Sequence, residues 1–166
     1  MNMTNNDILI RLRYALDIKD SDMVKIFKLG GVEITLDEVR MLLKKPEEDG
    51  DGFEDFLCTN YMLESFLNGF VVFKRGKQEP KPGQPAGPDL SLQNGGHPNN
   101  VMLKKVKIAL SLTSEDIIEI LQLAGVNISK GELSALLRKE GHKNYKPCGD
   151  RYARNFLKGL AIKNRR

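Results

Sequence analysis

Histidine and cysteine are scarce in this chain, with two of each in 166 residues. His142 and Cys148 together offer two metal ligands, whereas a structural zinc site needs four, and His97 lies in a proline-rich stretch elsewhere. Two cysteines do not form a disulfide framework, so Cys58 and Cys148 indicate a reducing compartment and small buried side chains. We therefore expect no metal site and no cofactor.

Long apolar runs and catalytic sets are also missing. No stretch of 18 apolar residues is present, and the N-terminus has no basic segment followed by an apolar one. Neither a Ser/His/Asp set, nor a Cys/His set, nor a glycine-rich phosphate loop is visible. The chain is therefore expected to be a cytoplasmic protein without a membrane span, and not an enzyme, so no catalytic residues are assigned.

What is present is a repeat. Residues 5–45 align with residues 99–139 at a constant offset of 94, and 15 of these 41 positions are identical. The similarity resumes at an offset of 90, where Cys58 matches Cys148 and Gly69 matches Gly159. A shared offset means two copies of one structural unit.

Apolar residues at helical spacing predict four helices in each copy. In the first copy these are expected over about 7–17, 21–29, 36–45 and 61–73, and the last helix of the second copy over about 151–163. An acidic, glycine-rich loop is expected over 47–55.

Residues typical of helix ends support these predictions. Asn6 is placed to cap the first helix, and Gly31 and Gly125 follow the second helices, where the backbone turns left-handed. The pairs Thr35/Glu38 and Ser129/Glu132 fit the capping box, in which hydroxyl and carboxylate each bind a backbone N–H at a helix start.

The predicted fold is all-α, with two tandem repeats in helix-turn-helix-like packing. The first repeat, 1–73, has 8 Lys or Arg and 14 Asp or Glu, a net charge of −6. A proline-rich and glycine-rich linker over 74–98 precedes the second repeat. The second repeat, 99–166, has 14 basic and 6 acidic residues, a net charge of +8. Repeats of this size lie near the lower limit for a self-sufficient core, so we expect them to pack on each other or on a second chain.

Two features of the second copy indicate nucleic-acid binding. The segment 116–139 has the outline of a helix-turn-helix, whose second helix would expose Lys130 and Arg138. The last helix bears a basic stripe, Arg151, Arg154 and Lys158, and the first helix bears Lys104, Lys105 and Lys107. The first-copy counterparts of the stripe are Tyr61, Glu64 and Asn68, so the stripe is not a requirement of the fold.

Several stretches resemble the YehS-like bacterial family, which is built from a tandem domain of unknown function. The resemblance rests on DILIRLRYALD in the first copy, and on KIALSLTSEDIIEIL and ISKGELSALLRKEGHKNY in the second. It implies a small, mainly helical cytoplasmic protein with two repeats. It carries over no activity, cofactor or catalytic residue.

These observations lead to two hypotheses. The first is a non-enzymatic binding protein that contacts nucleic acid through the second repeat. The alternative is a protein-interaction or scaffold module, including a dimer that pairs acidic and basic repeats. The basic residues are also compatible with a solvated face, or with a face complementary to the acidic first repeat.

Overall fold

Local sequence signals account for the start and end of the first helix. The computed structural model describes residues 3–44, 56–76 and 96–165. Helix α1 (Asn5–Leu16) begins after Thr4, and the side chains of Thr4 and Asp7 form a complete capping box. The helix ends at Asp17, which has the left-handed backbone conformation. Thr4 therefore replaces Asn6 as the cap that the sequence predicted.

The first repeat continues with three helices, α2 (Asp20–Leu29), α3 (Leu36–Leu42) and α4 (Asn60–Arg75). The second repeat contains α5 (Pro98–Ala109), α6 (Ser114–Leu123), α7 (Lys130–Leu137) and α8 (Asp150–Asn164). Within the described ranges every regular element is a helix, which confirms the all-α prediction and the two repeats of four helices.

The helix ends differ from the prediction by a few residues. Helix α3 ends at Leu42 instead of about Lys45, α4 extends to Arg75, and α5 begins at Pro98, so both helices enter the range assigned to the linker. Residues 77–95 of that linker and the whole predicted loop over 47–55 lie outside the described residues. Gly31 and Gly125 have φ of 95° and 82°, as the turn prediction required.

Of the two capping boxes predicted for the third helices, one forms in full and the other in part. Thr35 and Glu38 form the full reciprocal pair at α3. At α7, Ser129 accepts from the Glu132 backbone N–H, but the Glu132 carboxylate accepts a hydrogen bond from the Tyr152 hydroxyl of α8 at 3.3 Å. A tertiary contact thus takes the carboxylate that the local motif would use.

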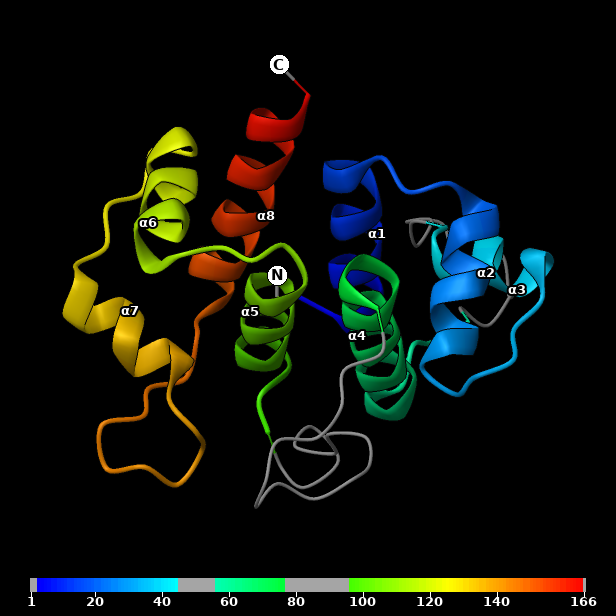
Figure 1. Ribbon diagram of the computed structural model, residues 1–166, viewed down its shortest axis with the longest axis horizontal. Coiled ribbons are helices and arrows are strands. Elements are labelled where there is room, and N and C mark those ends of the chain that lie inside the picture. Colours follow the sequence, from blue (N-terminus) through cyan, green and yellow to red (C-terminus); the bar gives the residue numbers. More distant parts are fainter. Residues whose placement is uncertain (1–2, 45–55, 77–95, 166) are drawn as a thin grey trace, which may run out of the picture.

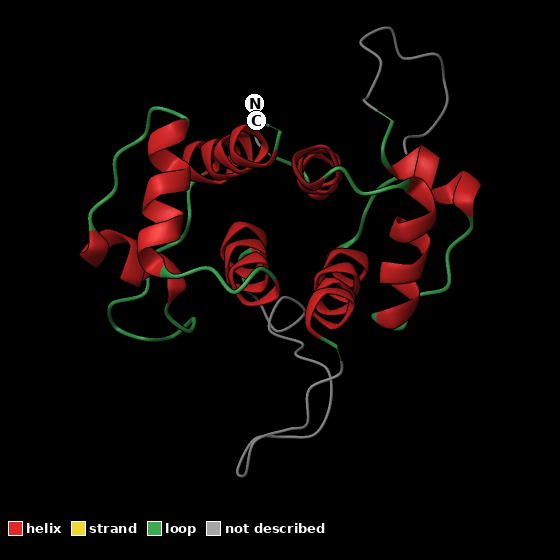
Figure 2. Cartoon of the chain, turned by 45° about the horizontal axis from the view of Figure 1, so that its top comes forward, coloured by secondary structure: helices red, strands yellow, loops and turns green. Residues whose placement is uncertain are grey.

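Four helices form a central block, arranged as two parallel pairs that cross from one repeat to the other (Figures 1 and 2). Helix α1 packs beside α8, and α4 packs beside α5, while α2 with α3 and α6 with α7 flank the two ends. Because α1 corresponds to α5 and α4 to α8, the two pairs are equivalent. The repeats therefore pack on each other within one chain, as an internal pseudo-dimer.

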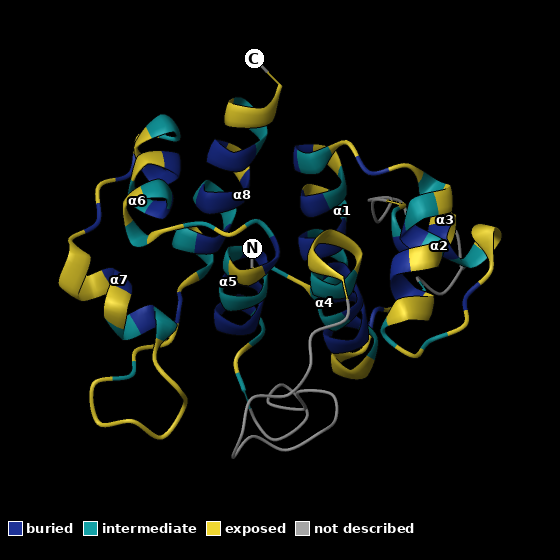
Figure 3. Cartoon of the chain, in the orientation of Figure 1, coloured by how far each residue is buried: buried dark blue, intermediate teal, exposed yellow. Residues whose placement is uncertain are grey.

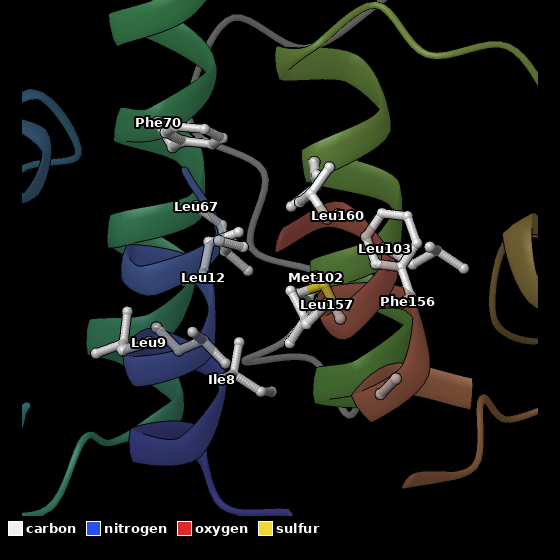
Figure 4. Packing of buried hydrophobic residues seen from close by; sticks show 14 of the residues in the cluster. Ile8, Leu9, Leu12, Leu67, Phe70, Met102, Leu103, Phe156, Leu157 and Leu160 are labelled. Carbon is white, nitrogen blue, oxygen red and sulfur yellow. The ribbon is translucent and has the colours of Figure 1, made fainter. Parts of the chain in front are cut away.

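The core is continuous across the two repeats. Buried side chains from both repeats belong to one cluster, and buried positions face the interior of the block (Figure 3). Figure 4 shows Ile8 and Leu12 of α1 turned toward Met102 and Leu157 of the second repeat. Each such side chain contributes about 1.5–3 kcal/mol when fully buried, so neither half retains its full core alone.

Matched arginines join the ends of the paired helices. Arg165 Nε donates to the Tyr14 carbonyl at 3.0 Å, and its guanidinium lies 3.9 Å above the centroid of the Tyr14 ring. At the equivalent place, Arg75 Nη1 donates to the Ile108 carbonyl at 3.3 Å. Both contacts place a cation at a helix C-terminus, where the helix dipole favours it.

Candidate functional site

A cationic groove lies between α5, α6 and α7 of the second repeat. Its volume is about 570 Å³. It is lined by four cations, two hydroxyls and two apolar side chains: Lys104, Lys107, Arg138, Lys139, Ser114, Ser134, Ile108 and Leu137. None of these lining residues is acidic. The groove therefore combines positive charge with hydroxyl donors.

Helical spacing brings these side chains together. Lys104, Lys107 and Ile108 are at i, i+3 and i+4 on α5, whereas Met102 and Val106 of the same helix are buried. Ser134, Leu137 and Arg138 have the same spacing on α7 and its C-terminal end, and Ser114 is the first residue of α6. The groove thus uses the outer faces of helices whose inner faces form the core.

The equivalent place in the first repeat is closed by an ion-pair cluster. Asp20 stands where Ser114 stands in the second repeat, and it pairs with Arg13 Nη2 at 2.9 Å and with Arg40 Nε at 3.7 Å. Arg13 corresponds to Lys107, and Arg40 corresponds to Ser134. The second repeat thus keeps cations at this place but lacks the carboxylate.

The structure divides the eight predicted residues into separate groups. Lys104, Lys107 and Arg138 line the groove. Lys105 is half-buried on α5 and is not among the lining residues. Lys130 pairs with Glu115 at 2.9 Å, and this hydrogen bond raises the pKa of Lys130 and lowers that of Glu115.

The basic stripe lies on α8, which is in the other layer of the central block (Figure 2). Arg151 and Lys158 are exposed and Arg154 is half-buried, so the stripe is not covered by the first repeat. The pKa of Asp150 is lowered, mainly by hydrogen bonds from Asn99 and the Met3 backbone, with a smaller contribution from Arg154. Groove and stripe are therefore two separate cationic surfaces.

Five lining residues are not among the predicted binding residues: Lys139, Ser114, Ser134, Ile108 and Leu137. The two serines give no signal by themselves. Their signal lies in the comparison of the copies, where Ser114 replaces Asp20 and Ser134 replaces Arg40.

A larger hollow of about 710 Å³ lies where the four central helices end, and its lining includes Lys74, Lys163, Arg165 and Asp17. Arg165 is engaged with the Tyr14 carbonyl and lies 3.7 Å from Asp17. Cations are expected at this end of the block because four helix C-termini meet there. We therefore assign these charges to the structure of the repeat interface.

The two cysteines are buried and free, which agrees with the small-side-chain interpretation. Burial raises the pKa of each thiol to about 12. The thiolate is the reactive form, so at pH 8 only about one thiol in 10,000 is ionised. We expect both thiols to resist iodoacetamide at pH 8 in the folded protein and to react in urea, as measured by mass spectrometry. Alkylation of either cysteine without urea would contradict this burial.

The part of the chain that the structure describes has neither a metal-binding cluster nor a helix suited to a membrane. No three or more His, Cys, Asp or Glu side chains there form a group able to hold a metal ion. No helix in the same ranges has both the length and the apolar character that crossing a membrane requires.

Comparison with known proteins identifies relatives without naming an activity. The model of the family described as "Protein of unknown function (DUF1456)" matches residues 5–76 and 99–166. The chain is 40% identical over 161 residues to "Uncharacterized protein YehS" of Escherichia coli (strain K12), covering 97% of this chain and 96% of that protein. No solved structure matches. The two matched segments coincide with the two structural repeats, and the chain belongs to the DUF1456 family as a tandem pair of its domains.

Proposed function

We propose that the protein is a non-enzymatic binding protein that contacts nucleic acid through its second repeat. The observation that supports this proposal is the groove of α5, α6 and α7, with four cations, two hydroxyls and no acidic lining residue. Phosphate groups bind Lys and Arg side chains and hydroxyls, and such contacts dominate nucleic-acid affinity. In the acidic first repeat, the Asp20 carboxylate pairs with Arg13 and Arg40 at the corresponding place.

We place the nucleic-acid contact in the groove between α5, α6 and α7, and not on α7 as a helix inserted into the major groove of DNA. A reading helix uses residues near its N-terminus. In α7 that end holds Lys130, paired with Glu115, and Glu132, which accepts from Tyr152. The groove lies at the C-terminal end of α7, so it suits phosphate contact better than base reading.

The alternative function, protein–protein interaction, is favoured by apolar side chains that the first repeat exposes. Leu57, Tyr61 and Met41 are 69%, 51% and 50% exposed. The corresponding residues of the second repeat are Pro147, Arg151 and Ala135. A pairing of acidic with basic repeats is less supported as the basis of a dimer, because the repeats already pack on each other through apolar helices within one chain.

A charge-reversal titration tests the nucleic-acid proposal. Fluorescence anisotropy would follow the binding of labelled single-stranded and duplex DNA and RNA at about 50 and 200 mM salt. We expect Lys107→Glu with Arg138→Glu to weaken binding by about tenfold or more and to reduce the salt dependence, because phosphate contacts are lost. The same experiment with Arg151→Glu and Arg154→Glu measures the contribution of the basic stripe.

Lys19→Glu with Lys28→Glu is the matched control, since it changes net charge equally on exposed residues of the first repeat. The proposal fails if the wild-type protein binds none of the four probes. It also fails if the control pair weakens binding as much as the groove pair does. Salt-sensitive self-association without nucleic-acid affinity, measured by light scattering, would support the alternative.

A further inference from the structure

The first repeat contains an anion held at the place that corresponds to the groove. That anion is the Asp20 carboxylate at the start of α2. Its Oδ1 accepts from Arg13 Nε at 3.0 Å, and Arg40 approaches its Oδ2 at 3.7 Å. The fold therefore has a position between the first, second and third helices of a repeat where an oxyanion fits among cations.

The second repeat has the same position, but no acidic residue is among those that line it. Lys107 replaces Arg13, and Ser114 replaces the residue that supplies the carboxylate. Arg138 and Lys139 occupy the end of α7 and line the same groove. Neither these two residues nor Lys107 forms an ion pair within the described part of the chain, so their mutual repulsion favours an external anion.

We propose that the groove of the second repeat is a site for one phosphate group, and that Asp20 fills the equivalent site of the first repeat. This inference rests on the proposed function and assigns its phosphate contact. Phosphate fits better than a second carboxylate because the Arg138 guanidinium, Lys107, Lys139 and the two hydroxyls provide more donors than a carboxylate needs. Ile108, 44% exposed, and Leu137 provide an apolar wall beside the charges, which suits a nucleoside attached to the phosphate.

Ser114→Asp tests the site by giving the second repeat its own anion. The variant is expected to fold, because Asp20 occupies the same first position of α2 and an acid is favourable at a helix N-terminus. Binding of inorganic pyrophosphate and of adenosine 5′-monophosphate would be measured by calorimetry. We expect one binding site per chain in the wild type and an affinity at least about tenfold lower in Ser114→Asp, because the new carboxylate occupies the donors.

Gln122→Glu is the matched control, since it adds one negative charge on α6 at an exposed residue that does not line the groove. Its affinity for both probes should stay within about twofold of the wild type, because the control leaves all groove contacts in place. An equal loss in Gln122→Glu and Ser114→Asp would overturn the proposal, since general charge would then explain the effect.

Asp20→Ser is the reverse experiment. Removing the carboxylate releases Arg13 and leaves Arg40 beside the exposed Asp37 at 3.8 Å, so we expect a second pyrophosphate site and a stoichiometry of two per chain. Asp20→Asn, which retains a hydrogen-bond acceptor for Arg13, is the second variant if the serine variant melts below the assay temperature. If the folded Asp20→Ser or Asp20→Asn protein still binds only one pyrophosphate per chain, the Asp20 position of the first repeat is not equivalent to the groove of the second.

The outcomes separate this inference from the proposed function. The first outcome is that the wild type binds pyrophosphate, that Ser114→Asp loses this binding, and that the protein has no affinity for any nucleic acid. This result supports the phosphate site and refutes the proposed function. The second outcome is that Ser114→Asp and the wild type bind nucleic acid equally, whereas charge reversal of Arg151 and Arg154 abolishes this binding. This result overturns the phosphate site and assigns nucleic-acid binding to the basic stripe.

Discussion

Gly159→Ala is expected to destabilise the protein by about 2–3 kcal/mol, which lowers Tm by roughly 4–12 °C. A Cβ at this position would lie 1.9 Å from the Ile120 carbonyl oxygen and 2.8 Å from its carbon. Both atoms belong to the α6 backbone, so the clash can be relieved only by moving α6 away from α8. The gain in helix propensity, about 1 kcal/mol, is smaller than this cost. Thermal denaturation followed by far-UV circular dichroism measures the change.

Gly131→Ala in α7 is the control, because a Cβ there meets no atom within 4 Å. It should leave Tm unchanged or raise it, by up to about 1 kcal/mol in stability. Gly69→Ala should behave like Gly159→Ala, since its Cβ would lie 1.9 Å from the Ile26 carbonyl oxygen in the equivalent helix pair. If Gly159→Ala melts at or above the wild-type temperature, α6 and α8 do not approach this closely.

Asn100→Ala is expected to cost about 3 kcal/mol or more. The Asn100 side chain is 2% exposed. Its amide donates to the carbonyls of Leu136 at 2.9 Å and Lys146 at 3.0 Å, and its oxygen accepts from the Cys148 N–H at 2.7 Å. Alanine would leave three backbone groups without these partners, each at a cost of about 1–3 kcal/mol where water does not replace them. The midpoint of urea denaturation should fall while the m-value stays constant.

Asn127→Ala provides the comparison, because Asn127 is exposed in the turn between α6 and α7. This substitution should change the free energy of unfolding by less than about 0.5 kcal/mol. Asn6→Ala tests the equivalent contacts of the first repeat, where the amide donates to the carbonyls of Leu42 and Phe56. Equal midpoints for Asn100→Ala and Asn127→Ala would show that these contacts contribute nothing to stability.

The paired asparagines show what local reasoning misses. The sequence predicts a helix cap at Asn6, because an asparagine before an apolar helical pattern favours that role. Its amide instead ties the end of α3 to the segment before α4, and Asn100 does the same in the second repeat. The signal was available, since both copies keep the Asn-Asn pair among only 15 identities in 41 positions, but its partners are about 36–50 residues distant.

The candidate site was predictable in part. The basic faces of the first and third helices of the second copy predict Lys104, Lys107 and Arg138, and the structure brings these three residues to one groove. Lys130 belonged to the same prediction, yet it pairs with Glu115 from another helix. Charge along one helix reveals which face is basic. It does not reveal which carboxylate of a neighbouring helix neutralises that face.

The helices, their glycine turns and the two equivalent repeats could be predicted from the amino-acid sequence, because apolar periodicity and capping residues act within a few residues of chain. The folded chain was needed to show that α1 pairs with α8 and α4 with α5, so that the two repeats share one core. It also decided that the stripe of α8 and the groove of α5–α7 are separate surfaces. Such pairings depend on the shapes of whole helix faces and on close approaches such as that of Gly159 to Ile120, which no local pattern contains.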